Sequence, residues 1–168
     1  MNEGGFAVMA TALCVSTVLA FSSGPPLPVL VTYNATESAA VGFYAVGPAR
    51  ELHVGDQVLS RLPGSVGDLA DERRYVPATT PVLKTVSAEA GDLVCRTGAV
   101  VTLNGRPVAR VHPRDHVGRP LPVWNGCGRL GDEELFLLGQ HPDSFDGRYF
   151  GPTDRTLIVG KVRPLWTW

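Results

Sequence analysis

The sequence predicts a mainly β domain of antiparallel strands behind one N-terminal transmembrane helix. The chain of 168 residues contains 19 Gly and 14 Pro, and helical domains rarely tolerate so many helix breakers. Short apolar runs between turn residues recur through the body, where no long segment repeats with the period of a helix. Residues 6–21, in contrast, are almost purely apolar. This length fits one domain and a short appendage.

The N-terminal segment is interpreted as a membrane anchor. No charged residue occurs between Glu3 and Glu37, and uncharged neighbours extend the run at 6–21 toward the roughly 20 residues that span a bilayer. A cleaved signal peptide is the alternative, but it normally has a basic start and an A-x-A-like cleavage site, whereas this chain starts MNEGG. The breakers GPPLP at 24–28 end the helix. We therefore divide the chain into an anchor with linker, 1–28, and a folded domain, 29–168.

The folded domain is predicted to consist of short strands in sequence order. The apolar runs fall at 29–33, 42–46, 57–59, 81–86, 92–95, 99–103, 134–138 and 156–162. Asn104 and Gly105 between two such runs predict a two-residue hairpin. The polar residues 63–75 predict a loop or a short helix, and the Gly-, Pro- and His-rich residues 112–132 predict a long loop.

Composition and cysteine spacing exclude several functions. The formal net charge is −1, so no basic excess points to a nucleic-acid partner. Cys95 and Cys127 have neither CxxC spacing nor paired histidines nearby, which is a weak pattern for zinc, and we expect no metal and no cofactor. A disulfide between them fits if the domain faces an oxidising compartment.

Two residues stand out as candidates for chemistry. Ser38 lies in the polar run NATES, and Lys84 lies among apolar neighbours in PVLKTV. A lysine on a strand that faces a core is a candidate general base, because burial disfavours its charged form. The alternative for Lys84 is an edge-strand lysine that limits aggregation.

Three separated blocks resemble the signal-peptidase family of Ser–Lys proteases. Residues 34–38 (NATES) with 42–44 (GFY) resemble its nucleophile box. Lys84 precedes Gly-Asp at 91–92 with the spacing of leader peptidases, and residues 144–151 (SFDGRYFG) resemble the C-terminal box. The blocks span nearly the whole body in the family's order. The resemblance implies an antiparallel signal-peptidase-like β domain behind its membrane helix.

The subtype resembles the conjugative-transfer TraF-type branch. Residues 118–130, just ahead of the third block, are similar to that branch. Ala39 follows the serine where the housekeeping branch has Met, and residues 139–142 (GQHP) replace its acidic Gly-Asp-Asn run. Ala40 departs from the proline usual in TraF-type enzymes.

The resemblance implies a Ser–Lys dyad in which Ser38 attacks the scissile carbonyl and Lys84 takes its proton. An ordinary lysine, with a pKa of about 10.4, is almost fully charged at neutral pH, so the amine needs a dry pocket. The Ser38 backbone N–H would form half of the oxyanion hole. The Thr36 hydroxyl is the second candidate donor, with a turn-capping hydroxyl as the equal alternative.

The third block contributes supporting residues by the same resemblance. Ser144 would orient the Lys84 amine. Asp146 and Arg148 would brace this wall of the site, and Asp146 joins the catalytic set in a supporting role. A purely structural ion pair is the alternative for the two. The chain's four histidines match none of the three boxes, which argues against a Ser–His–Asp triad.

The resemblance implies a membrane-bound serine endopeptidase that matures an exported prepilin for a conjugative transfer apparatus, with a linear or a cyclic product. The partners would be the prepilin or preprotein substrate, the inner membrane and components of a type IV secretion or conjugation apparatus. The domain would lie in the bacterial periplasm, with Cys95 and Cys127 joined. A general type I signal peptidase is the main alternative. A non-catalytic membrane-anchored module fits less well, because Ser38, Lys84 and Asp146 occur together. A self-cleaving repressor also fits less well, because an apolar membrane segment stands in the place of its DNA-binding domain.

Overall fold

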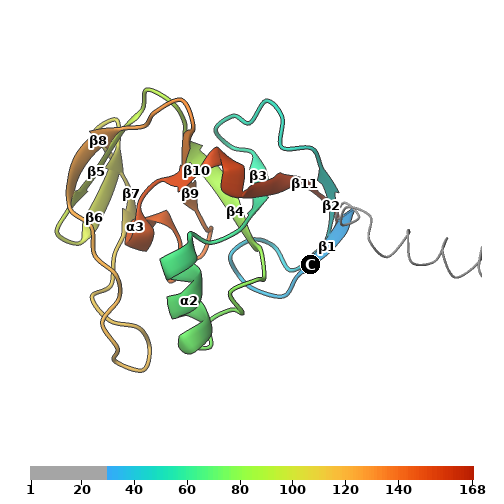
Figure 1. The fold of residues 1–168 in the computed structure, drawn as a ribbon, viewed down its shortest axis with the longest axis horizontal. Coiled ribbons are helices and arrows are strands. Elements are labelled where there is room, and N and C mark those ends of the chain that lie inside the picture. Colours follow the sequence, from blue (N-terminus) through green and yellow to red (C-terminus); the bar gives the residue numbers. More distant parts are fainter. Residues whose placement is uncertain (1–29) are drawn as a thin grey trace, which may run out of the picture.

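A computed structural model describes residues 30–168, and its strands form two antiparallel sheets (Figure 1). The large sheet has seven strands in the order β1-β2-β11-β3-β4-β9-β10, and the small sheet has four in the order β7-β6-β5-β8. The strands of the large sheet are β1 (Val31–Asn34), β2 (Gly42–Gly47), β3 (Gln57–Ser60), β4 (Val82–Ala88), β9 (Glu134–Leu138), β10 (Thr153–Asp154) and β11 (Ile158–Thr167). Those of the small sheet are β5 (Leu93–Thr97), β6 (Val100–Leu103), β7 (Arg106–Arg110) and β8 (Gly126–Arg129).

Three short helical segments connect the strands. Helix α2 (Gly64–Glu72) links β3 to β4 and lies beside the sheets in Figure 1. Helix α3 (Gly147–Phe150) follows β9, and a 3₁₀ turn, η1 (Arg155–Leu157), precedes β11. The side chain of Asp146 accepts a hydrogen bond from the Arg148 backbone N–H and so caps α3.

Strand β9 is buried on both faces from Leu135 onward, which explains the unbroken apolar sequence LFLL that follows Glu134. Phe136 and Leu138 pack with the small sheet and Tyr149, whereas Leu135 and Leu137 pack into a second cluster on the opposite face. Neighbouring strand residues point to opposite faces, so one strand serves both cores. A third cluster forms around Tyr44.

The small sheet is inserted between β4 and β9 in the sequence. Its β6–β7 hairpin turns at Asn104 and Gly105, which have φ of 50° and 80°. These positive values are those of a type I′ turn, so the predicted hairpin is confirmed. Buried Val94, Val101 and Leu103 pack this sheet against the large one.

The structure confirms the mainly β, antiparallel class and adds elements that the sequence pattern did not predict. The long loop predicted at 112–132 is wrong for residues 126–129, because they form β8 and pair with β5. Residues 64–72 take the helical alternative. The predicted anchor and linker, 1–28, lie outside the described residues. Within 30–168 no helix is long and apolar enough to cross a membrane.

Candidate active site

Ser38 lies in the turn between β1 and β2, and Asn34 holds that turn together. The Asn34 amide nitrogen donates to the backbone carbonyls of Thr36, Ala39 and Ala40 at 2.7, 3.0 and 3.1 Å. Its Oδ1 accepts from the Thr36 backbone N–H at 3.2 Å. An asparagine that bonds the backbone two residues on forms an Asx-turn. The buried Asn34 side chain therefore fixes the backbone on both sides of Ser38.

The far side of the same turn is anchored in the core. Ala39 is buried with Tyr44, Leu59 and Leu83. The Tyr44 hydroxyl donates to the Ala40 carbonyl at 2.6 Å. Ala40 stands where the resemblance leads us to expect proline, and these bonds to its carbonyl hold the turn at that position.

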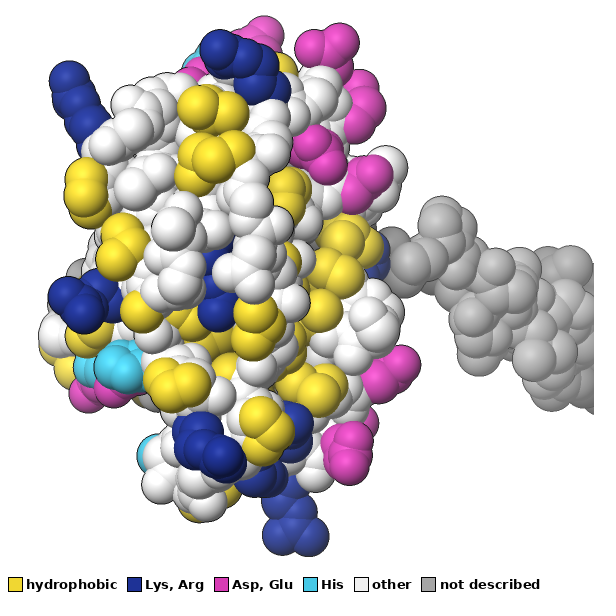
Figure 2. Space-filling view, turned by 90° about the vertical axis from the view of Figure 1, so that its left-hand side faces the viewer, with side chains coloured by type: hydrophobic (Ala, Val, Ile, Leu, Met, Phe, Trp, Pro, Cys, Tyr) yellow, Lys and Arg dark blue, Asp and Glu magenta, His cyan; other side chains and the backbone are white. Residues whose placement is uncertain are grey.

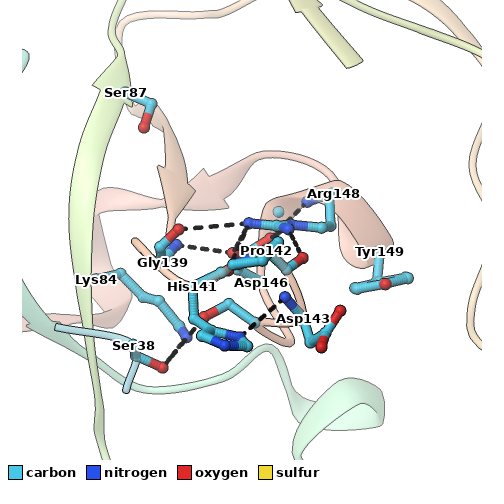
Figure 3. Close-up of polar contacts among 12 residues, drawn as sticks. Ser38, Lys84, Ser87, Gly139, His141, Pro142, Asp143, Asp146, Arg148 and Tyr149 are labelled. Carbon is cyan, nitrogen blue, oxygen red and sulfur yellow. Dashed lines mark hydrogen bonds and ion pairs between the residues drawn. The ribbon is translucent and has the colours of Figure 1, made fainter. Parts of the chain in front are cut away.

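Lys84 is the base candidate that the structure brings to Ser38. Its Nζ lies 3.0 Å from Ser38 Oγ, and the residue is 3% exposed (Figure 3). It sits on β4 opposite Val58 of β3. Strand β4 is flanked by β3 and β9, so the edge-strand alternative for Lys84 is wrong.

Burial lowers the pKa of Lys84 from 10.5 to about 8. Desolvation is the largest cause, because the dry surroundings disfavour the ammonium form. The carboxylate of Asp146 opposes this effect and the guanidinium of Arg148 reinforces it. At pH 7, one unit below this pKa, roughly one amine in ten is neutral and can act as a base.

Ser144 and Gly139 form the wall opposite the dyad. Ser144 Oγ lies 3.3 Å from Ser38 Oγ. Within residues 30–168 the hydroxyl of Ser144 thus bonds the nucleophile candidate and not the Lys84 amine that it was expected to orient. A Cβ at Gly139 would lie 2.1 Å from Ser144 Oγ and 3.3 Å from Lys84 Nζ. Gly139 therefore leaves the space in which the two side chains meet Ser38.

Asp146 and Arg148 form a buried ion pair behind this wall. Arg148 Nε donates to Asp146 Oδ1 at 2.8 Å, and a second guanidinium nitrogen donates to Oδ2 at 3.0 Å. Asp146 Oδ2 also accepts from the Gly139 backbone N–H at 2.7 Å. Arg148 further donates to the backbone carbonyls of Pro142, Gly139 and His141. The pair fixes the segment that carries Gly139 and Ser144, which is the bracing geometry expected of it.

Thr36 takes the turn-capping geometry. Its hydroxyl donates to Asn34 Oδ1 at 3.0 Å, so its one proton is used within the turn. His141 lies beside the dyad in Figure 3, and its Nε2 lies 3.2 Å from Glu37 Oε2. The backbone N–H of Gln140 donates to the Ser38 carbonyl at 2.8 Å. These contacts attach the segment after β9 to the nucleophile turn.

An open cleft of about 260 Å³ leads to Ser38 and Lys84. Most of its lining is apolar, with Leu62, Val82 and Leu83 among the contributing residues. An apolar cleft with two convergent polar groups is the usual form of a binding site for small or extended ligands. Among residues 30–168, no three His, Cys, Asp or Glu side chains lie close enough to hold a metal ion.

Cys95 and Cys127 form a disulfide in the small sheet, away from the dyad. They lie directly opposite each other on β5 and β8. The neighbouring Arg96 is buried, and its guanidinium donates to the Arg148 carbonyl at 3.1 Å. The small sheet therefore supports α3, which carries the ion pair.

Asn34 and Gly139 lie within the sequence motifs, but the motifs predicted no role for either residue. An Asx-turn signal, Asn two residues before Thr, could have identified Asn34. Gly139 follows a buried strand, and its role depends on side chains from β4 and residue 144 that no local pattern contains.

Comparison with known proteins gives a family match over nearly the whole chain. The model of the family described as signal peptidase, peptidase S26, matches residues 4–168. The match includes Ser38, Lys84, Ser144 and Asp146.

Curated relatives and a solved structure were also found. The plasmid transfer protein TraF of Escherichia coli is 37% identical over 147 residues, which cover 80% of this chain and 82% of that protein. The conjugal transfer protein TraF of Agrobacterium tumefaciens is 31% identical over 173 residues, covering 97% and 92%. A crystal structure of a signal peptidase I from Enterococcus faecalis aligns with a TM-score of 0.41 and 14% identity, over 68% of this chain and 98% of that one.

Proposed function

The chain belongs to the signal peptidase family, peptidase S26, and we propose that it is a membrane-bound serine endopeptidase that matures an exported prepilin for conjugative transfer. The single observation that carries the catalytic part is the 3.0 Å contact between the buried Lys84 amine and the Ser38 hydroxyl. A nucleophile and a base within hydrogen-bond reach, with the base pKa lowered, are the requirements for covalent catalysis by a hydroxyl.

The reaction begins with neutral Lys84. Its Nζ takes the Ser38 hydroxyl proton while Oγ bonds to the scissile carbonyl carbon. The backbone N–H of Ser38 stabilises the resulting oxyanion. The Lys84 ammonium then gives its proton to the leaving amine, the C–N bond breaks, and an acyl-Ser38 ester remains.

The second half repeats the proton transfers with a new nucleophile. Lys84 takes a proton from water or from an amine, which attacks the ester and releases Ser38. Water gives a linear product, and the N-terminal amine of the same substrate gives a ring. Asp146 and Arg148 support both halves by holding the segment of Ser144 in place.

The names of the curated relatives support a conjugation substrate. Proteins called plasmid transfer or conjugal transfer protein TraF align with most of this chain, and the aligned region is also most of their own length. The proposed substrate is therefore the exported pilin precursor of a transfer apparatus, and components of that apparatus are the proposed partners.

We propose that the domain lies on the periplasmic side of the inner membrane, where the Cys95–Cys127 disulfide would persist. Exposed apolar side chains gather on and next to β1, β2 and β11, close to residue 30, where the described chain begins. They are Leu30, Val31, Tyr33, Phe43, Leu165, Trp166 and Trp168. The Tyr33 ring lies 5.0 Å from Phe43 and 6.2 Å from Trp168, centroid to centroid. Amphipathic aromatic side chains favour membrane interfaces. This surface supports the anchor proposed for residues 1–28, which would hold it at the bilayer.

The test is processing of a tagged prepilin in cells that make wild type or Ser38→Ala. The variant should accumulate precursor at an unchanged protein level, because one partly exposed hydroxyl contributes little to stability. Normal processing by Ser38→Ala would contradict the nucleophile role.

A gene deletion separates this function from a general signal peptidase. The deletion should block mating and leave the export of an abundant secreted protein intact in a pulse-labelling assay. Accumulated precursors of unrelated secreted proteins with normal mating would favour the general peptidase.

A further inference from the structure

A second open cavity, of about 710 Å³, adjoins the active-site cleft and shares two lining residues with it. Tyr75 and Phe145 line both spaces, and their ring centroids lie 5.4 Å apart in an edge-to-face arrangement. The two spaces therefore adjoin at these rings, so the second cavity is a neighbouring site for a polypeptide bound at Ser38. Its volume lies within the range of roughly 300–1,000 Å³ that ligand sites occupy.

The second cavity is lined by more cations than available anions. Arg74, Arg114 and two histidines contribute to its lining, together with Asp115 and Asp143. Asp115 Oδ2 forms an ion pair with Arg119 Nε at 2.7 Å, and Asp143 Oδ1 lies 3.3 Å from His112 Nε2.

Both arginines of the lining remain without a carboxylate partner within residues 30–168. Arg114 donates to the carbonyl of Gly118 in its own loop, which orients its guanidinium without neutralising it. In Figure 2 basic side chains are spread from top to bottom over the face that carries the small sheet, while acidic ones lie mostly along its upper and right-hand margins.

The wall between the two spaces is held rigidly. The Tyr75 hydroxyl donates to Asp115, and the Arg119 guanidinium lies 5.3 Å from the centre of the Tyr75 ring. Arg73, just after α2, donates to the Pro120 carbonyl at 2.7 Å. The end of α2 is thereby fastened to the loop at 112–122, which lies next to it in Figure 1. A preformed wall costs little ordering entropy when a ligand binds.

We propose that this second cavity binds a carboxylate of the polypeptide substrate, on Arg74 and Arg114, while the scissile bond lies at Ser38. This inference rests on the proposed peptidase function and adds a determinant of specificity to it. The guanidinium group matches a carboxylate in geometry as well as in charge. The carboxylate is either an Asp or Glu side chain or the C-terminus of the substrate.

The test is a cleavage profile of the full-length protein on a proteome-derived peptide library, read by mass spectrometry. Wild type should cut peptides that have Asp, Glu or a free C-terminus at one fixed position from the cut. Arg74→Glu/Arg114→Glu should lose this preference and gain one for Lys or Arg. A matched control, Arg50→Glu/Arg106→Glu, changes the same charge at exposed residues outside the cavity and should keep the wild-type profile.

Kinetics on one peptide selected from that profile give the magnitude. The charge-reversed variant should raise KM roughly tenfold with kcat unchanged, as expected for the loss of two ion pairs made by exposed arginines. Replacing the peptide carboxylate by an amide should raise KM for wild type by a similar factor. For the charge-reversed variant the same replacement should lower KM, because the two glutamates repel the carboxylate. Separate peptides with an amidated C-terminus and with Glu→Gln distinguish the two sources of the carboxylate.

Two results would overturn the inference. One is a wild-type profile with cleavage but without an acidic preference at any position, and the other is a preference that survives charge reversal. A wild-type protein that cuts no peptide would contradict the proposed function itself, and the inference would fall with it.

Discussion

The Lys84 amine lies 3.0 Å from the Ser38 hydroxyl, although 46 positions separate the two residues in the chain. Strand β4 presents the amine from within the large sheet. The Asx-turn after β1, which is an edge strand of the same sheet, presents the hydroxyl. Both positions depend on long-range pairing, and both are needed for proton transfer.

Activity should rise with pH up to the pKa of Lys84. Burial lowers that pKa from 10.5 to about 8, and the neutral amine is the active base. Below pH 8, kcat/KM should fall about tenfold for each pH unit, and above it a plateau should follow. A pH–rate profile on one peptide checks this. Lys84→Arg should be inactive at every pH, because guanidinium does not lose its proton. A flat profile from pH 6 to 9, or an active arginine variant, would contradict the general-base role.

Lys84→Met should be more stable than wild type at pH 7. In the unfolded chain the amine keeps a pKa near 10.5, against about 8 when folded. Between these values the unfolded state binds more protons, so wild-type stability rises with pH across that window. Below pH 8 the full penalty of the buried charge applies, about 3 kcal/mol at 1.36 kcal/mol per pH unit. Urea denaturation of both proteins at pH 7 and pH 10 measures the difference in their free energies of unfolding. The advantage of Lys84→Met over wild type should be smaller at pH 10 than at pH 7.

Gly139→Ala should lose most activity and some stability. The new methyl group would lie 2.1 Å from Ser144 Oγ and 3.3 Å from Lys84 Nζ, which forces the wall away from Ser38. Overpacking of this kind costs roughly 1–3 kcal/mol. Gly64→Ala is the matched control, because a Cβ there meets nothing within 4 Å. Equal kcat in the two variants would show that the space at Gly139 is not needed.

Asp146→Asn should destabilise the fold by about 3–5 kcal/mol, because it leaves the buried Arg148 guanidinium without its counter-charge. Asp56→Asn breaks the less buried pair with Lys161 and should cost much less. Thermal and denaturant unfolding of the two variants compare them. Similar losses at both sites would contradict a special role for the Asp146–Arg148 pair.

Removing the Cys95–Cys127 disulfide should lower stability by roughly 3–4 kcal/mol, since it closes a loop of 32 residues. The variant Cys95→Ser/Cys127→Ser should retain its dyad and cut peptides at low temperature, because the bond lies in the small sheet. Alkylation without reductant followed by mass analysis tests the bond itself. Two labelled thiols at these positions in the native protein would contradict the pairing.

Much of the fold could be predicted because its signals are local. Short apolar runs between turn residues mark the strands, and the Asn104–Gly105 pair determines its hairpin through backbone conformation alone. Strand β8 could not be predicted in this way. Its residues, GCGR, are all exposed and carry no apolar alternation, so it exists through pairing with β5. Helix α3 is similarly short and depends on the cap from Asp146.

The sequence by itself determined which residues belong to the candidate site, because Ser38, Lys84, Ser144 and Asp146 lie in short motifs that can be read individually. Only the tertiary structure decided how those residues act together. In the folded chain Lys84 is buried on β4 between β3 and β9. The Thr36 hydroxyl donates to Asn34 within the turn, and the Ser144 hydroxyl is hydrogen-bonded to that of Ser38. The physical reason is that motifs reflect local chemistry. Burial, pKa and the space at Gly139 arise from packing between segments far apart in the chain.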